Sequence, residues 1–274
     1  MRYMIASGWW SCPTGEDDRS KVYGDDSIRD ISFHYLWREC IDRFTDPSEI
    51  MVIDSDSPKK PEEIRGEKWL SMSKNFGHST NHSGQFSGYT RAIFLSMMYA
   101  YANDFDYWVY IEQDALIYGD RIIEKSIAES KHGVVYGSGK GTPQQIQQSF
   151  MIFNTEAIPD FINNYVAINK KDKIISPEWK FLFAQNRLAT ILPLGLLRWL
   201  TKTSKNQVIS WVRWSALRFL RKFDQFDTFD FGFGRSRPIK FSDSHFYFQH
   251  GNEDEVQAFK KKLANIGRFN DHTP

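Results

Sequence analysis

Short apolar runs alternate with stretches of helical periodicity along the first half of the chain. The apolar runs have the length and composition of strands and lie at 3–7, 49–58 and 106–114. Between them, at 27–44 and 88–103, apolar residues recur at helical spacing. This alternation predicts an α/β fold in which helices cover a parallel or mixed sheet.

The alternation continues for three more elements before the pattern changes. A helix is predicted at 120–130, and two further short strands at 133–139 and 149–155. The stretch 179–223 then contains no Asp or Glu and is rich in Leu and Trp, and a basic helix is predicted at 255–267. The chain from residue 179 onward is therefore expected to have a different role from the alternating strands and helices before it.

These changes predict one large domain with a helical, basic appendage on its C-terminal side. Residues 1–180 form the predicted core, 181–235 a basic and aromatic helical segment, and 236–274 a segment that returns to the core and ends in a helix. With 274 residues, the chain is long enough to bury a full hydrophobic core.

Polar residues at the ends of the predicted strands mark a candidate site. Ser7, Asp54, Glu112 and Asp114 all fall at such ends, and ligands of open α/β sheets bind beyond the carboxyl ends of the strands. Burying an unpaired carboxylate costs several kcal/mol or forces it to take up a proton. The two neighbouring acids at 112 and 114 therefore indicate either a solvated strand end or a positively charged ligand.

Composition narrows the class of function. The chain has 35 Lys and Arg against 34 Asp and Glu, a near-neutral balance that argues against a general nucleic-acid binder. Its two cysteines, Cys12 and Cys40, are too few for a disulfide framework, which favours a reducing compartment. No apolar run has the length of a signal peptide or a membrane span, so we expect a cytoplasmic protein.

Several motifs, in this order, resemble the nucleotide-sugar-dependent glycosyltransferases of the GT-A fold. GYTRAIFLSMMYAYANDFDYWVYIEQD (88–114) is similar to the helix, turn and DxD strand of these enzymes, with EQD in place of DxD. QSFMIFNTEA (148–157) resembles the acceptor-side strand that follows, and SPEW (176–179) stands where an acidic base is common. FYFQHG (246–251) resembles the late segment that returns a histidine to the metal. The resemblance implies a GT-A-like mixed, mainly parallel sheet flanked by helices.

The same resemblance implies roles for individual residues. Asp114 would bind a metal directly, Glu112 would reach the ribose or a metal-bound water, and His250 would be a late metal ligand. Arg91 stands where a basic residue often contacts the nucleotide. Glu178 would be the catalytic base, deprotonating an acceptor hydroxyl for a direct displacement that inverts the anomeric centre. A retaining mechanism, which needs no such base, stays open.

The implied chemistry requires a nucleotide-sugar donor and a divalent cation. The pyrophosphate of such a donor carries about two negative charges, which a hard cation with oxygen ligands neutralises as the bond to the sugar breaks. Mg²⁺ or Mn²⁺ would suit, with Mn²⁺ favoured by an imidazole ligand. We expect a UDP-sugar, with a GDP-sugar as the alternative, and we expect Ser7 and Asp54 to contact the nucleotide.

The acid-free stretch 179–223 predicts a second interaction. RLATILPLGLLRWL and SWVRWSALRFLRKF carry Trp, Leu and Phe with basic residues at roughly helical intervals, as interfacial amphipathic helices do. The basic residues are Lys180, Arg187, Arg198, Lys202, Lys205, Arg213, Arg218, Arg221 and Lys222. We expect peripheral association with the inner face of an anionic membrane and a glycan or lipid-linked glycan acceptor, as in surface polysaccharide assembly. The alternative is a pair of core helices whose arginines meet acids elsewhere.

Two other classes of function remain open. A nucleotidyltransferase also uses carboxylates at strand ends with a metal, but usually has a basic, Gly-rich phosphate loop near its first strand, where this chain has ASGWWSCPTGEDD. A non-catalytic membrane-surface binding protein could use a degenerate GT-A-like scaffold. The acids at 112, 114 and 178 are intact, which argues against such decay.

Overall fold

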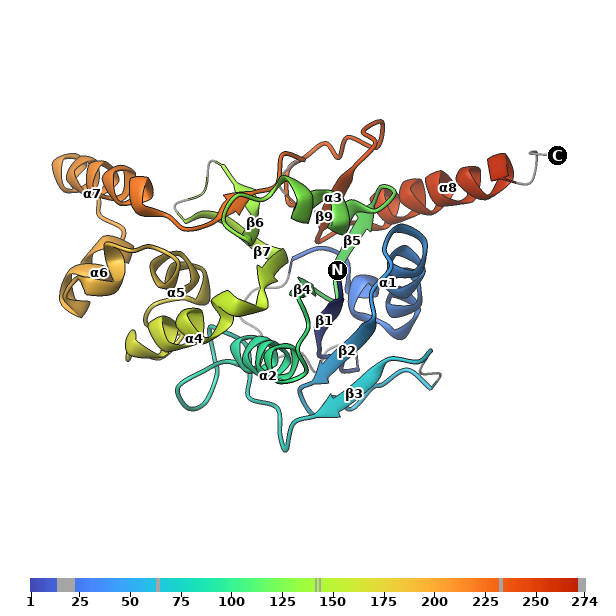
Figure 1. Cartoon of the computed structure of the whole chain (residues 1–274), viewed down its shortest axis with the longest axis horizontal. Helices are drawn as coiled ribbons and strands as arrows, with labels where there is room; N and C mark the ends of the chain where they lie inside the picture. The colour runs from blue at the N-terminus through green and yellow to red at the C-terminus, as the bar shows by residue number, and fades with distance from the viewer. Residues whose placement is uncertain (14–22, 63–64, 141, 143, 232–233, 271–274) are drawn as a thin grey trace.

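A mixed, mainly parallel sheet of seven strands forms the centre of the computed structural model (Figure 1). The model describes residues 1–13, 23–62, 65–140, 142, 144–231 and 234–270. In spatial order the strands are β3 (Lys68–Ser71), β2 (Glu49–Asp54), β1 (Tyr3–Trp9), β4 (Tyr107–Ile111), β7 (Gln145–Asn154), β6 (Val134–Gly139) and β8 (Asp227–Thr228). Strand β7 pairs antiparallel with β4 and β6, and the other pairs are parallel. The expected GT-A-like sheet is confirmed.

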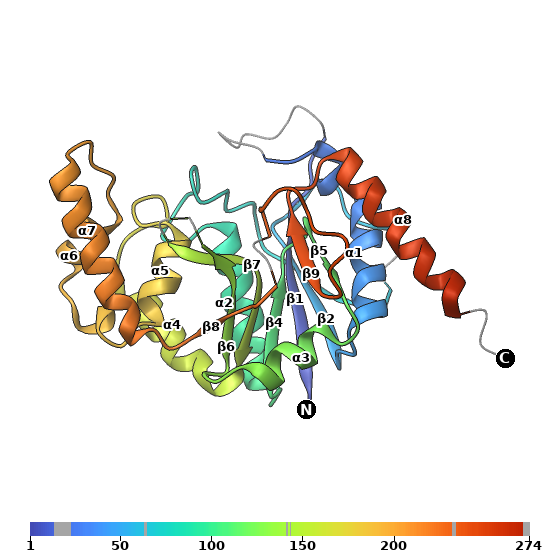
Figure 2. The same cartoon turned by 90° about the horizontal axis from the view of Figure 1, so that it is seen from above.

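One face of the sheet is covered by α2 (Gly88–Ala102), α4 (Ile158–Ala167) and α5 (Pro177–Ala184). The side chains of β1 alternate between the two faces, and Met4 and Ala6 point into the core on this side. Helices α6 (Leu194–Thr201) and α7 (Gln207–Leu220) extend this layer at one end of the molecule (Figure 2). This face therefore carries the predicted basic segment.

The opposite face packs against α1 (Ile31–Phe44), α3 (Ile122–Glu129) and α8 (Glu253–Asn270). A second, two-stranded sheet lies on this side and pairs β5 (Ala115–Tyr118) antiparallel with β9 (Phe246–Gln249). This pairing brings the late segment 246–251 back to the chain that follows β4. Short 3₁₀ turns complete the described elements: η1 (Asp26–Arg29), η2 (Thr155–Ala157), η3 (Ala189–Ile191) and η4 (Arg221–Phe223).

The structure differs from the sequence-based prediction in a few elements. Strand β3 was not predicted, because its mostly exposed side chains at the sheet edge give no buried alternation. Strand β8 and helix α4 were not predicted either. Part of the stretch ASGWWSCPTGEDD lies outside the described residues. Among the described helices, none is both long enough and apolar enough to cross a bilayer.

The basic segment is less uniform than its sequence indicated. Its helices bury Leu197, Leu200, Leu217 and Leu220 in the same core as the sheet, and the expected boundary at 180/181 falls inside α5. The basic residues in and next to this segment differ in exposure. Lys180, which directly precedes the segment, is fully buried and 2.8 Å from Asp172, and Arg213 is only 8% exposed. Arg221 is exposed, but it contacts Gln145 and lies 3.8 Å from Asp224. Lys180 and Arg213 are therefore not surface cations.

Candidate active site

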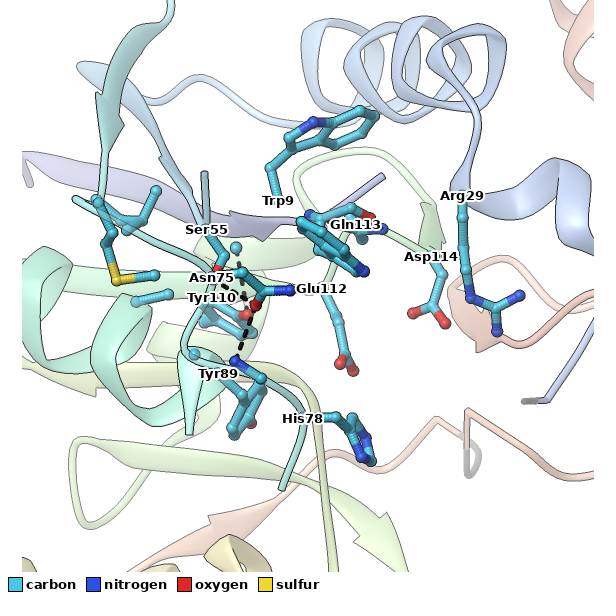
Figure 3. Close-up of a pocket in the computed structure, with 17 residues that line it drawn as sticks. Trp9, Arg29, Ser55, Asn75, His78, Tyr89, Tyr110, Glu112, Gln113 and Asp114 are labelled. Atoms are coloured by element: carbon cyan, nitrogen blue, oxygen red, sulfur yellow. Dashed lines mark hydrogen bonds between the residues drawn. The ribbon is translucent and has the colours of Figure 1, made fainter. Parts of the chain in front are cut away.

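A cavity of about 130 Å³ opens at the carboxyl ends of β1, β2 and β4, beside the first turn of α2 (Figure 3). Its lining comes from the ends of strands and from the loops that follow them. The described lining residues are Gly8, Trp9, Trp10, Arg29, Ile53, Ser55, Met72, Asn75, Gly77, His78, Gly88, Tyr89, Ala92, Tyr110, Glu112, Gln113 and Asp114. The sheet edge expected to bind a ligand is thus hollowed, and both acids of EQD reach it.

The EQD triplet forms a tight turn between β4 and β5. The backbone N–H of Ala115 donates to the carbonyl oxygen of Glu112 at 2.9 Å and closes this turn. Gln113, at its corner, binds the backbone of Trp10 twice: its amide Nε2 donates to the carbonyl oxygen at 2.9 Å, and its Oε1 accepts from the N–H at 2.6 Å. The middle residue of the triplet therefore fixes the loop after β1, while the flanking acids face the cavity.

A glutamine from β9 joins the two acids. Register pairs Gln249 with Ala115, so its side chain reaches the EQD turn, and its Nε2 donates to Glu112 Oε2 at 2.5 Å and to Asp114 Oδ1 at 3.0 Å. Gln147 donates to the Oε1 of this amide at 2.8 Å, which orients its Nε2 toward the acids. A buried donor shared by two carboxylates holds both side chains in place.

The acids differ in their electrostatic environment. Burial, together with the nearby Asp114 carboxylate, raises the pKa of Glu112 to about 8. Burial lowers the pKa of His250 against the opposing effect of Asp114, and with the smaller effects of Arg235 and Arg29 the pKa is about 4. The His250 imidazole is therefore neutral near pH 7, and its Nε2 lies 3.3 Å from Asp114 Oδ2.

The side chains that could ligate a metal here fit an ion that is bound together with a substrate. Within the described ranges, no group of three or more His, Cys, Asp and Glu side chains is arranged to hold an ion. Asp114 and His250 together offer a carboxylate oxygen and a neutral ring nitrogen, which suit Mn²⁺. Mg²⁺ and similar ions commonly use one or two protein carboxylates and take their remaining ligands from substrate phosphates and water. The pair therefore fits an ion that arrives with a diphosphate better than a closed protein site.

Three residues expected to contact the nucleotide lie outside the described lining of the cavity. Ser7 is buried on the opposite side of β1 from Gly8, and its hydroxyl donates to the Gly8 carbonyl at 3.3 Å. Asp54 is fully buried and lies 2.8 Å from Lys60 Nζ. Arg91 packs 3.9 Å over the Phe76 ring. Because each has a partner within the protein, their nucleotide contacts stay predictions.

Glu178, the expected base, lies in the first turn of α5 and is half-buried. It is not part of the described lining of the cavity, but its charge contributes to the raised pKa of Glu112, after the larger effects of burial and Asp114. This places Glu178 within electrostatic range of the EQD acids. Its role as a base stays a prediction.

Sequence reasoning missed several residues of the site. Trp10, Arg29 and Tyr89 line the cavity, and Arg29 extends toward Asp114 in Figure 3. Gln249 was overlooked although it directly precedes His250, because an amide carries no charge pattern to single it out. Tyr110 could have been found from strand alternation: its hydroxyl accepts a hydrogen bond from the Gly8 N–H at 3.3 Å at the cavity wall.

Neither a protein-family model nor a curated protein matches the sequence. Among solved structures, TarS of S. aureus has 11% identity and a TM-score of 0.42; the match covers 67% of this chain and 34% of TarS, so the chain spans about a third of that protein. HddC of Yersinia pseudotuberculosis has 11% identity and a TM-score of 0.46, with 96% of this chain and 100% of HddC covered. The glycosyltransferase GlyE of Streptococcus pneumoniae TIGR4 has 12% identity and a TM-score of 0.39, with 84% and 46% covered. The GT-A-like description of this chain rests on its own sheet order and on the helices that flank the sheet.

Proposed function

We propose that this protein is a metal-dependent glycosyltransferase that moves a sugar from a nucleotide-sugar donor to a hydroxyl of a glycan or lipid-linked glycan. One observation carries the proposal: Glu112 and Asp114, joined by Gln249, face a cavity at the carboxyl ends of parallel strands, with His250 against Asp114. Two neighbouring acids that are largely removed from solvent are costly without a positive ligand, so their presence favours a cation-binding role.

Asp114 and His250 would hold a divalent cation at the donor diphosphate, and Mn²⁺ or Mg²⁺ suits these ligands. Such an ion, when bound, neutralises the charge of the departing diphosphate. Glu112 lies beside this pair and would accept a hydrogen bond from the ribose or from water. Arg29, which lines the cavity, adds positive charge on the side of Asp114.

The aromatic residues of the cavity would bind the nucleoside. Trp10 and Tyr89 line it at the end of β1 and at the start of α2, and aromatic rings offer flat apolar surface to a base. A UDP-sugar is the favoured donor. Glu178, beside the acids, would deprotonate the acceptor hydroxyl in an inverting displacement. A role in surface polysaccharide assembly at the cytoplasmic side of a membrane agrees with this chemistry.

A thermal-shift panel of nucleoside diphosphates with and without Mn²⁺ tests the proposal. UDP, or less strongly GDP, should stabilise the protein only when the cation is present, because the acids and the diphosphate repel each other without it. A ligand at about 100 times its Kd adds about 2.7 kcal/mol of stability. The variant Asp114→Asn should lose the Mn²⁺-dependent part and still fold.

Asp160→Asn, which alters an exposed acid on α4, is the matched control and should respond as wild type does. Equal stabilisation of wild type and Asp114→Asn by UDP with Mn²⁺ would refute the metal assignment. Stabilisation by nucleoside triphosphates in place of diphosphates would instead indicate a nucleotidyltransferase.

A further inference from the structure

Arg213 is a buried arginine with no ion-pair partner among the residues that the structure describes. It lies on α7, its side chain is only 8% exposed, and its Nε is shielded from solvent without a hydrogen bond. In the part of the chain that the structure describes, no acid lies within ion-pair distance of its guanidinium. The stretch 179–223 contains no Asp or Glu at all. A buried charge is costly without a counter-charge, and no described acid supplies one for Arg213.

Arg213 lines a cavity of about 310 Å³ next to α6 and α7. Four hydroxyl side chains and a lysine also line it: Thr201, Thr203, Ser204, Ser210 and Lys202. Guanidinium groups bind phosphate through paired N–H donors, and hydroxyl groups and an ammonium supply further donors. A phosphate group matches this set of donors, and the cavity is large enough to admit it.

The surface next to the cavity is apolar and basic. Along α7, Val208 and Trp211 are 69% and 70% exposed, Phe219 is 53% exposed, and Trp214, which lines the cavity, is 43% exposed. The two helices stand at one end of the molecule, away from α8 (Figures 1 and 2). Exposed basic residues accompany these side chains: Arg198, Lys202, Lys205, Arg218 and Lys222. A soluble phosphate would explain Arg213 but not the exposed Trp and Val side chains, which suit the headgroup boundary of a bilayer.

We propose that the Arg213 cavity binds the phosphate group of an anionic membrane lipid while α7 lies on the membrane surface. The exposed apolar side chains of α7 enter the headgroup boundary, the exposed cations face the negative surface, and Arg213 takes one lipid phosphate. This arrangement gives the buried guanidinium its counter-charge only at the membrane.

Helix α5 connects this cavity to the candidate active site. Trp179 lines the Arg213 cavity, and the preceding residue, Glu178, acts electrostatically on Glu112. A lipid-linked acceptor held by its phosphate at Arg213 would therefore lie on the Glu178 side of the donor site. This acceptor role rests on the proposed function, whereas the binding of lipid phosphate does not.

Vesicle cosedimentation of the whole chain tests the proposal. Wild type should bind vesicles of equal parts phosphatidylcholine and phosphatidylglycerol and should not bind phosphatidylcholine alone. Arg213→Met keeps the volume and removes the charge, and should lower the affinity at least tenfold. The matched control Arg218→Met removes one exposed charge from the same helix and should lower it by about fivefold or less, as expected for one cation near an anionic surface.

A second measurement keeps the test decisive if a variant folds poorly. In phosphate-free buffer, Arg213→Met should unfold at a higher urea concentration than wild type, because it removes an uncompensated buried charge. Arg213→Lys keeps the positive charge but loses the paired N–H donors of the guanidinium. It should therefore bind vesicles less tightly than wild type. Equal losses of vesicle binding for Arg213→Met and Arg218→Met would overturn the lipid site and leave only general surface attraction.

Inorganic phosphate and glycerol phosphate separate the two possible sources of the ligand. Strong thermal stabilisation of wild type but not of Arg213→Met by these ions, without vesicle binding, would assign the cavity to a soluble phosphate and overturn the membrane proposal. Because these readouts involve neither nucleotide nor sugar transfer, they stand whether or not the proposed glycosyltransferase activity is found.

Discussion

Replacing Lys180 with methionine should destabilise this protein more than most single changes. Lys180 Nζ lies 2.8 Å from Asp172 Oδ1, and both side chains are fully buried. Asp172 also accepts hydrogen bonds from Thr90 Oγ1 at 2.7 Å, from Ser87 N–H at 2.8 Å and from Tyr165 O–H at 3.1 Å. The carboxylate therefore joins α4 and α5 to the N-terminus of α2, and Lys180 is its cationic partner among the described residues.

The magnitude follows from leaving this carboxylate without its counter-charge. Breaking a buried ion pair by removing one partner costs about 3–5 kcal/mol. That is a large part of the 5–15 kcal/mol by which domains are typically stable. The remaining hydrogen bonds to Asp172, which also include one from Ser87 Oγ at 3.1 Å, reduce the loss, so we expect about 3 kcal/mol. For a chain of this size, such a loss lowers Tm by roughly 6–12 °C.

Urea denaturation followed by tryptophan fluorescence measures this change. Lys173→Met alters an exposed lysine that directly follows Asp172 in the chain. It is the matched control and should shift stability by less than about 0.5 kcal/mol. The double variant Lys180→Met with Asp172→Asn should recover part of the loss, because the buried charge is removed as well. A loss of under about 1 kcal/mol for Lys180→Met would show that Asp172 does not depend on this pair, and would refute the reasoning.

Three further changes have defined outcomes. Glu178→Gln should keep the stabilisation by UDP and Mn²⁺ but lower sugar transfer about 10²-fold or more, as loss of a general base does; turnover near the wild-type rate would mean that the base lies elsewhere or that the enzyme is retaining. Gln249→Leu removes the donor shared by the two EQD acids and should cost about 1–3 kcal/mol in urea denaturation, whereas an unchanged midpoint would show that the bridge is not needed. Burial raises the pKa of Asp224 from 3.8 to about 6, so the folded state binds this proton more tightly than the unfolded state, and stability falls as pH rises from about 4 to 6. Asp224→Asn should lose this pH dependence and should be more stable than wild type above pH 6 by up to about 3 kcal/mol. If stability in urea denaturation changes with pH in the same way for wild type and Asp224→Asn, this prediction is wrong.

Some features of this protein follow from local sequence. The alternation of strand and helix patterns predicted the sheet and most helices. Apolar residues that recur every two residues indicate a strand, and those that recur about every 3.6 residues indicate a helix, so both patterns can be recognised in the sequence. The EQD strand end was also visible in the sequence, and the return of His250 was implied by the resemblance of FYFQHG to a late segment of GT-A enzymes. The absence of acids from 179–223 marked the basic segment for the same reason.

The roles of individual polar residues were decided by tertiary packing. Lys180 and Arg213 belong to the same acid-free stretch, yet Asp172 neutralises the first and no described acid neutralises the second. Gln249 reaches the EQD acids because β9 pairs with β5, more than 130 residues earlier in the chain. Asp54 lies at the end of a strand as expected, but its carboxylate is paired with Lys60. The sequence determines which charges and periods are present, whereas burial and pairing depend on contacts between distant segments that only the folded chain brings together.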